Sequence, residues 1–417
     1  MRRLRGSSRS VLTLLAGSAA AQIIPISVSP ILTRIYTPAE FGVLSLFVAI
    51  SSVLGVVACA RYEQAIMLPE KESDAIAVAA LALSLATLFS CFLFVFFFFF
   101  GGWLNSLWEQ GLQEWLYLIP LVVWFFAVFS LLTTFHSRRK QYRDIALANV
   151  SKSVMVSGLQ VCLGFLKFGT SGLLIGHVAG AVLGSCKMLR SLLREPDLIR
   201  SFDFGLLCSQ AAKYKDFPKY SLWGALANAL SVSFVGVLIS VCYSITALGI
   251  YALVQRILGG PISLVSGSFG QVFYQKASVE LRETGGVYFS FVAALKRLVA
   301  ISFIPFIVLF FIIEDLVMFV FGDGWLEAGH YAQILVPVFA VRFVVSPLSL
   351  VNQVLQNNRV GMCWQLVLLL GTAMSITVSS VLGLTIESGL MVLSLFSTIW
   401  YLVLLFWIFP RKPEAVS

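Results

Sequence analysis

Charged side chains are scarce in this chain. They make up 12% of its 417 residues, about half the share that is usual in soluble domains. There are three histidines, and the seven cysteines show no close pairing, so no disulfide framework or metal site is indicated. A glycine-rich phosphate loop with its lysine is also missing, which excludes direct use of ATP by this chain.

Features typical of a membrane-embedded glycosyltransferase or polymerase are lacking too. Such an enzyme should show acidic or histidine clusters at the membrane face, or a large outer loop. The sequence has neither, and none of its joints reaches the size of a domain. We therefore expect a protein that is not an enzyme and that needs no cofactor, although a membrane-bound polymerase or ligase stays open as an alternative.

Long apolar runs are what the chain has in abundance. Hydrophobic residues make up 59% of it, and a helix needs about 20 consecutive apolar residues to cross the hydrocarbon core of a bilayer. The runs are continuous, unlike the alternating pattern of barrel strands. The sequence predicts an all-α polytopic membrane protein with about twelve transmembrane helices, at 10–33, 41–60, 76–100, 115–135, 146–168, 171–191, 220–241, 246–272, 296–314, 331–351, 361–383 and 388–409.

The distribution of lysine and arginine predicts the orientation, because cytoplasmic loops are enriched in both. With both termini in the cytoplasm, all but four of the 29 basic residues fall at cytoplasmic joints. One such group comprises Arg138, Arg139, Lys140, Arg143 and Lys152. The exceptions are Arg34, Lys167, Arg256 and Arg342. The net charge of +9 is thus a topology signal and gives no reason to expect a nucleic-acid partner.

Two segments allow a second interpretation. Glu314 and Asp315 interrupt the ninth apolar run, so residues 315–322 are either part of that helix or a short interfacial helix. The first 21 residues have the basic, apolar and small-residue regions of a secretory signal peptide. A weak internal repeat favours a first transmembrane helix instead.

The repeat relates two halves of the chain. Residues 192–219 form the longest and most charged joint and divide the chain into six-helix bundles at 1–191 and 220–417. A shift of 207 residues places Gly17 on Gly224, Gly42 on Gly249 and Gln64 on Gln271. Six helices separate the copies, so they are parallel repeats, which implies a pseudo-two-fold axis along the membrane normal. Two such bundles are the architecture of a rocking transporter.

Two arginines lie in the middle of predicted helices. A charge at the centre of a membrane helix costs ~2.5–3.5 kcal/mol on insertion scales, so each needs a reason. Arg256 and Arg342 have no Asp or Glu at their depth, which favours a cationic cleft for an anionic substrate over structural pairing. Arg34, at the outer end of the first helix, is either part of that cleft or a snorkelling anchor.

Weaker candidates for a polar cavity are His177, Gln22 and Asn228, for which interhelical hydrogen bonding is the alternative role. Glu63, at the inner end of the second helix, is the nearest candidate for ion coupling. Without a clear coupling carboxylate, outward movement of an anion could instead be driven by the membrane potential, which supplies ~2.3 kcal/mol per charge per 100 mV. The tryptophans near the outer interface, Trp103, Trp108, Trp115 and Trp325, are expected to be belt anchors for the most part.

Three stretches resemble a known family: ILTRIYTPAEFGVLSLF followed by RYEQAIMLPE, GIYALVQRILGGPISLVSGSFGQVFYQKAS, and FVFGDGWLEAGHYAQILVP. They are similar to the oligosaccharide flippases, or polysaccharide biosynthesis proteins, of the multidrug/oligosaccharidyl-lipid/polysaccharide exporter superfamily. The likeness spans essentially the whole chain and rests on the order and spacing of the motifs.

This resemblance implies two six-helix bundles that work by alternating access in the bacterial inner membrane. The implied substrate is an undecaprenyl-pyrophosphate-linked oligosaccharide repeat unit, moved from the cytoplasmic to the periplasmic leaflet for O-antigen, capsule or exopolysaccharide assembly. The implied partners are membrane lipid and the polysaccharide polymerase and chain-length proteins. A drug/cation antiporter of the same superfamily is an alternative, although it would want an acidic cavity, and a lipid II flippase typically has more helices.

Overall fold

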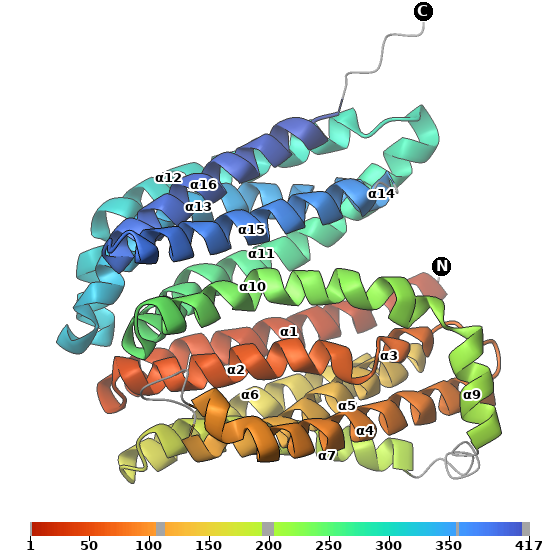
Figure 1. The fold of residues 1–417 in the computed structure, drawn as a ribbon. Coiled ribbons are helices and arrows are strands. Elements are labelled where there is room, and N and C mark those ends of the chain that lie inside the picture. The colour runs from red at the N-terminus through yellow and green to blue at the C-terminus, as the bar shows by residue number, and fades with distance from the viewer. Residues whose placement is uncertain (1, 106–112, 194–203, 356–357, 411–417) are drawn as a thin grey trace, which may run out of the picture. The chain divides into compact units, whose positions relative to one another are not determined.

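The structure is a computed structural model that describes residues 2–105, 113–193, 204–355 and 358–410. All regular elements of these residues are helices (Figure 1). The chain forms two compact units, Met1–Val237 and Leu238–Ser417, here called unit 1 and unit 2. The division between the two units falls within a helix that follows the predicted linker at 192–219. The predicted domain boundaries stay a prediction.

Unit 1 contains α1 (Arg2–Ile35), α2 (Pro38–Ala58), α3 (Tyr62–Ala65), α4 (Glu72–Asn105), η1 (Gln113–Leu118), α5 (Ile119–Arg138), α6 (Tyr142–Phe165), α7 (Thr170–Leu193), α9 (Phe204–Lys213) and η2 (Phe217–Ser221). The division between the units falls within α10 (Leu222–Cys242). Unit 2 contains α11 (Ile245–Thr284), α12 (Tyr288–Phe321), η3 (Asp323–Trp325), α13 (Leu326–Leu348), α14 (Val351–Val354), α15 (Asn358–Val381) and α16 (Ile386–Ile408).

Twelve helical stretches of the described residues are long and apolar enough to cross a membrane. Each of the twelve predicted helices overlaps one of them, so the predicted fold class is confirmed. The alternative of a separate interfacial helix at 315–322 is wrong, because α12 continues without a break to Phe321. The Glu314 carboxylate is accommodated near the end of α12 by His330 of α13, whose Nδ1 lies 2.9 Å from Glu314 Oε1.

The start of α2 is fixed by its own sequence. Thr37 is the N-cap, Pro38 occupies the first turn, and the Glu40 carboxylate accepts a 2.7 Å hydrogen bond from the Thr37 backbone N–H. This reciprocal capping box satisfies backbone donors that the helix leaves open. Ser244 caps α11 through the Ala247 N–H and lies 207 residues after Thr37, so both caps obey the spacing of the internal repeat.

Glycine brings three helices of unit 1 close together. Gly17 of α1 lies against Ala146 of α6, where an added Cβ would stand 2.4 Å from the Ala146 Cβ. On α7, glycine recurs every fourth residue from Gly172 to Gly184 and faces α6; at Gly180 an added Cβ would meet Val156 at 2.1 Å. Small residues at this spacing let membrane helices approach closely.

The tryptophans differ in their surroundings. Trp103 is 63% exposed, as a belt anchor would be, and Trp115 is partly exposed. Trp325 is 2% exposed and belongs to the core of unit 2, so the interpretation of this residue as a belt anchor is wrong. Trp108 lies outside the described residues.

Candidate functional site

Arg256 and Arg342 lie on neighbouring helices of unit 2. Arg256 is the twelfth residue of α11 and Arg342 the seventeenth of α13, and these two helices pack together. Phe339 approaches Gly259, where an added Cβ would stand 3.6 Å from its ring. This approach marks the register of the two helices, with Arg256 one turn before it and Arg342 one turn after it. At 1.5 Å of rise per residue, their Cα atoms differ in level by about 9 Å.

No carboxylate pairs with either guanidinium in the part of the chain that the structure describes. The guanidinium carbon of Arg342 lies 5.9 Å from the centre of the Phe339 ring, so this side chain runs back toward the start of α13, as helical side chains do. The hydroxyl groups of Tyr251 and Tyr401 are within electrostatic range of Arg342. Arg342 therefore has polar and aromatic neighbours that leave its charge uncompensated.

Aromatic and amide groups extend this region across three helices. Gln255 Nε2 donates a 2.5 Å hydrogen bond to the Tyr251 hydroxyl on α11. Tyr401 of α16 packs edge-on against Trp364 of α15, with ring centres 4.9 Å apart. Trp364 and Trp400 each donate their indole N–H to the other's backbone carbonyl, at 3.3 and 3.1 Å. The Tyr251 hydroxyl and both indole N–H groups are therefore already hydrogen-bonded.

Lys152 is a third cation at membrane depth, and the sequence analysis missed it. It is the eleventh residue of α6, well inside the helix, although its position in the sequence grouped it with the cytoplasmic basic residues. Its ammonium lies 4.8 Å from the centre of the Phe129 ring on α5, and its stem covers Gly184 of α7. Lys152 lies this far inside the helix because α6 begins at Tyr142, four residues before the predicted start at 146.

His177 belongs to the same region of unit 1. It lies on α7 within electrostatic range of Lys152, and its ring meets the Phe47 ring edge-on at 6.2 Å. Within the described residues it makes no hydrogen bond, so it contributes a ring contact in place of the interhelical bond that was considered. The side chains of Phe47, Phe129, Lys152 and His177 join α2, α5, α6 and α7.

The other predicted cavity residues are exposed. Arg34 occupies the last turn of α1, the position expected of a snorkelling anchor. Gln22 on α1 and Asn228 on α10 are also exposed. The role of these three residues in a cavity stays a prediction.

Glu63 lies in the turn between α2 and α4 and is 4% exposed. Its Oε1 is 3.3 Å from Arg61 Nη1, while its Oε2 is buried without a hydrogen bond in the described part of the chain. Burial raises the pKa of this carboxyl above its ordinary value, and Arg61 lowers it by less. A buried carboxyl of this kind is suited to exchanging a proton.

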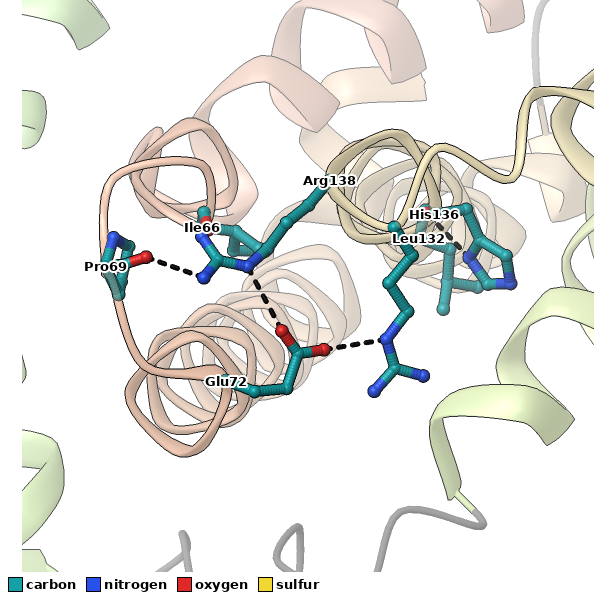
Figure 2. A network of polar contacts seen from close by, with 7 residues as sticks. Ile66, Pro69, Glu72, Leu132, His136 and Arg138 are labelled. Atoms are coloured by element: carbon teal, nitrogen blue, oxygen red, sulfur yellow. Dashed lines mark hydrogen bonds and ion pairs between the residues drawn. The ribbon is translucent and has the colours of Figure 1, made fainter. Parts of the chain in front are cut away.

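A second network holds this turn in place, as Figure 2 shows. Arg138, at the end of α5, donates to the backbone carbonyls of Ile66 and Pro69 at 2.9 and 2.6 Å. Arg138 and Arg139 both bond the Glu72 carboxylate at the start of α4, at 3.4 and 2.7 Å. Of the basic residues predicted on the cytoplasmic side, Arg138 and Arg139 therefore have a structural role, whereas Lys140 is exposed.

Comparison with solved structures identifies the fold. The chain is similar to a structure described as lipid II flippase MurJ in an inward closed conformation, with 12% identity, a TM-score of 0.79, and coverage of 95% of this chain and 87% of that one. It is also similar to a MOP superfamily transporter from Pyrococcus furiosus, with 12% identity, a TM-score of 0.61, and coverage of 96% and 95%. A multidrug resistance MATE family transporter of the MOP superfamily, in an inward-facing conformation, gives 13% identity, a TM-score of 0.56, and 95% coverage of both chains.

Curated protein sequences give no match to this chain. The profile of a family described as polysaccharide biosynthesis protein matches residues 31–330, which is well over half of the sequence. This match and the twelve apolar helices agree with the resemblance carried by the sequence motifs. The chain is a multi-pass membrane protein that belongs to the polysaccharide biosynthesis protein family and has the fold of MOP superfamily flippases and transporters.

Proposed function

We propose that this protein is a flippase for undecaprenyl-pyrophosphate-linked oligosaccharide repeat units. It would move them from the cytoplasmic to the periplasmic leaflet of a bacterial inner membrane by alternating access, for O-antigen, capsule or exopolysaccharide assembly. The observation that carries the proposal is the pair of mid-span arginines, Arg256 and Arg342, which have no carboxylate partner among the described residues. Guanidinium groups bind phosphate oxygens with a matching two-pronged geometry.

The family and one structural neighbour support this choice of substrate. The family's description is polysaccharide biosynthesis protein, and the structure with a TM-score of 0.79 is described as a lipid II flippase. In the mechanism we propose, the diphosphate and sugars pass the cationic residues while the polyprenyl tail stays in lipid. Arg34, His177, Gln22 and Asn228 are proposed as further polar contacts along the path.

Orientation, coupling and partners complete the proposal. The positive-inside distribution supports cytoplasmic N- and C-termini. Glu63 is proposed as the coupling carboxyl, since its burial and its raised pKa suit proton exchange. Movement driven by the membrane potential is the alternative. A polysaccharide polymerase and chain-length proteins would receive the flipped units.

Deletion of the gene tests the function. We expect lipid-linked repeat units to accumulate on the cytoplasmic side, with loss of surface polysaccharide. Accumulation on the periplasmic side would contradict the proposal and indicate a polymerase or ligase. Unchanged pools in both leaflets would contradict it as well, and would favour a drug/cation antiporter, as the multidrug transporters among the structural neighbours suggest.

A further inference from the structure

The linker between the halves of the chain docks on the turn that contains Glu63. Its described elements are α9 and η2; α9 packs against α4, and η2 packs against α3. The Tyr62 hydroxyl donates a 3.0 Å hydrogen bond to the backbone carbonyl of Ala211 in α9. In Figure 1, α9 (light green) lies at the end of unit 1 that carries α3. The turn and the linker are thus in direct contact beside Glu63.

Three buried polar atoms near this contact lack hydrogen bonds among the described residues: the acceptors Glu63 Oε2 and Gln210 Oε1, and the donor Arg61 Nε. Glu63 directly follows Tyr62 in the sequence, and Gln210 directly precedes Ala211. Both acceptors therefore belong to neighbours of the two residues that form the hydrogen bond between the turn and α9. An unpaired buried acceptor is costly. A proton on the Glu63 carboxyl would convert one acceptor into a donor and remove part of this cost.

The backbone of the turn is held in an unusual conformation. Ala60 has φ 47° and Arg61 has φ 66°, in the left-handed region that non-glycine residues seldom adopt. Such residues persist only where their surroundings hold them, and they cluster at switch regions. Here the anchors are the Arg61–Glu63 ion pair and the bonds from Arg138 to the carbonyls of Ile66 and Pro69.

Several other charged groups near the turn have partners of their own. Of the elements packed against α3, α4 contributes Glu72, whose carboxylate bonds both Arg138 and Arg139 of α5. The buried His136 of α5 lies 2.9 Å from the Leu132 carbonyl. Lys219 of η2 and Lys213 of α9 lie over the rings of Tyr220 and Tyr214. Arg61 and the buried Cys59 thiol interact electrostatically with Glu63.

We propose that Glu63 is a proton-operated latch for the linker. With the proton bound, the carboxyl acts as a donor in the buried cluster and α9 stays docked on α3. With the proton lost, an incompletely paired carboxylate occupies the buried site, and undocking of α9 restores its hydration. The latch itself is a property of unit 1; its use in controlling a transport cycle rests on the proposed function.

The direction of the pH dependence follows from linkage. The docked state has the higher carboxyl pKa, because burial raises it above the ordinary value of 4.5. The docked state therefore binds more protons between pH 4.5 and that higher pKa, and its stability falls as the pH rises through this window. Arg61 favours the charged form of the docked Glu63 carboxyl, so its removal destabilises the deprotonated docked state and should enlarge the undocked population at high pH.

Spin-label distance measurements on the full chain in lipid nanodiscs test the latch. One label is placed on the native, exposed Cys208 of α9 and the other on Ser73→Cys at the start of α4. The remaining cysteines are replaced, except for buried Cys59. We expect a narrow distance distribution at pH 4.5 and a growing second, longer population as the pH is raised to 8.5.

Three variants make the test specific. Glu63→Gln mimics the protonated carboxyl and should keep α9 docked at every pH, whereas Arg61→Gln should enlarge the undocked population at high pH. Glu70→Gln, at an exposed carboxylate of the same turn, should leave it unchanged. A wild-type distribution that does not change with pH, or a Glu63→Gln variant that still responds, would overturn the latch. Because the readout is structural, either result leaves the flippase proposal to its own test.

Discussion

The Arg342 guanidinium lies over the Phe339 ring, with 5.9 Å between the guanidinium carbon and the ring centre. Phe339 in turn approaches α11 at Gly259, so the ring that lies beside the cation also faces the helix that carries Arg256. A cation over an aromatic face gains ~0.5–2 kcal/mol, less than the ~2.5–3.5 kcal/mol cost of a charge at mid-membrane. The remaining cost is consistent with a functional role for Arg342.

Substitutions of Arg342 should separate the effect of its positive charge on transport from the effect of its guanidinium shape. We expect Arg342→Ala to abolish surface polysaccharide in cells while the protein remains inserted, because the anionic head group loses a binding partner. Arg342→Lys should restore a small part of the activity, since an ammonium keeps the charge but lacks the guanidinium fork. Arg282→Ala, an exposed position at the end of α11, is the matched control and should behave as wild type. Full activity in Arg342→Ala would show that this arginine is structural.

The two halves offer a matched pair of glycines. Gly17 and Gly224 occupy equivalent positions in the repeat, but an added Cβ would stand 2.9 Å from the Ala146 backbone at Gly17 and meets nothing within 4 Å at Gly224. Gly17→Ala should therefore force α1 away from α6 and destabilise the protein by ~1–3 kcal/mol. Gly224→Ala should be neutral or slightly stabilising. Thermal unfolding in detergent measures both, and equal melting temperatures would contradict the described packing of α1 on α6.

Arg138 should be a determinant of stability with no direct part in transport. It bonds two backbone carbonyls and Glu72 while its side chain is 14% exposed, so Arg138→Ala leaves buried acceptors unpaired. We expect a loss of about 2 kcal/mol and faster proteolysis of the turn at 66–71. The exposed Arg143→Ala on α6 serves as the control. Wild-type protease resistance in Arg138→Ala would refute the anchoring role.

Lys152, unlike Arg138, should contribute to transport while lowering the stability of the protein. It is a cation at membrane depth with no carboxylate partner among the described residues, so replacement by an apolar side chain of similar length removes a desolvation cost. Lys152→Met is expected to raise the melting temperature and to reduce transport, a combination typical of functional residues. The exposed Lys140→Met is the comparison. A lower melting temperature in Lys152→Met would indicate that the ammonium stabilises unit 1.

The twelve helices could be predicted because the bilayer demands long apolar runs, and the Thr37 to Glu40 turn carries its own capping signal. The position of Lys152 well inside α6 could not be predicted, because polar residues such as Asp144 and Ser151 conceal the true start of the helix. Counting basic residues to predict orientation also takes no account of how far along a helix each one lies. Burial of Trp325 depends on tertiary packing that an interfacial position in the sequence does not reveal. The approach of Phe339 to Gly259 likewise depends on the register between α11 and α13, which no single helix specifies.

The most direct test of the central claim is flipping of undecaprenyl-pyrophosphate-linked oligosaccharide by the purified protein in sealed vesicles. The measured quantity is the fraction of the lipid-linked sugar that an externally added glycosidase can cleave over time. We predict that the wild-type protein makes the inner pool accessible and that the Arg256→Ala/Arg342→Ala double variant does not, with equal reconstitution of both. No movement by the wild-type protein, or equal movement by the double variant, would contradict the account.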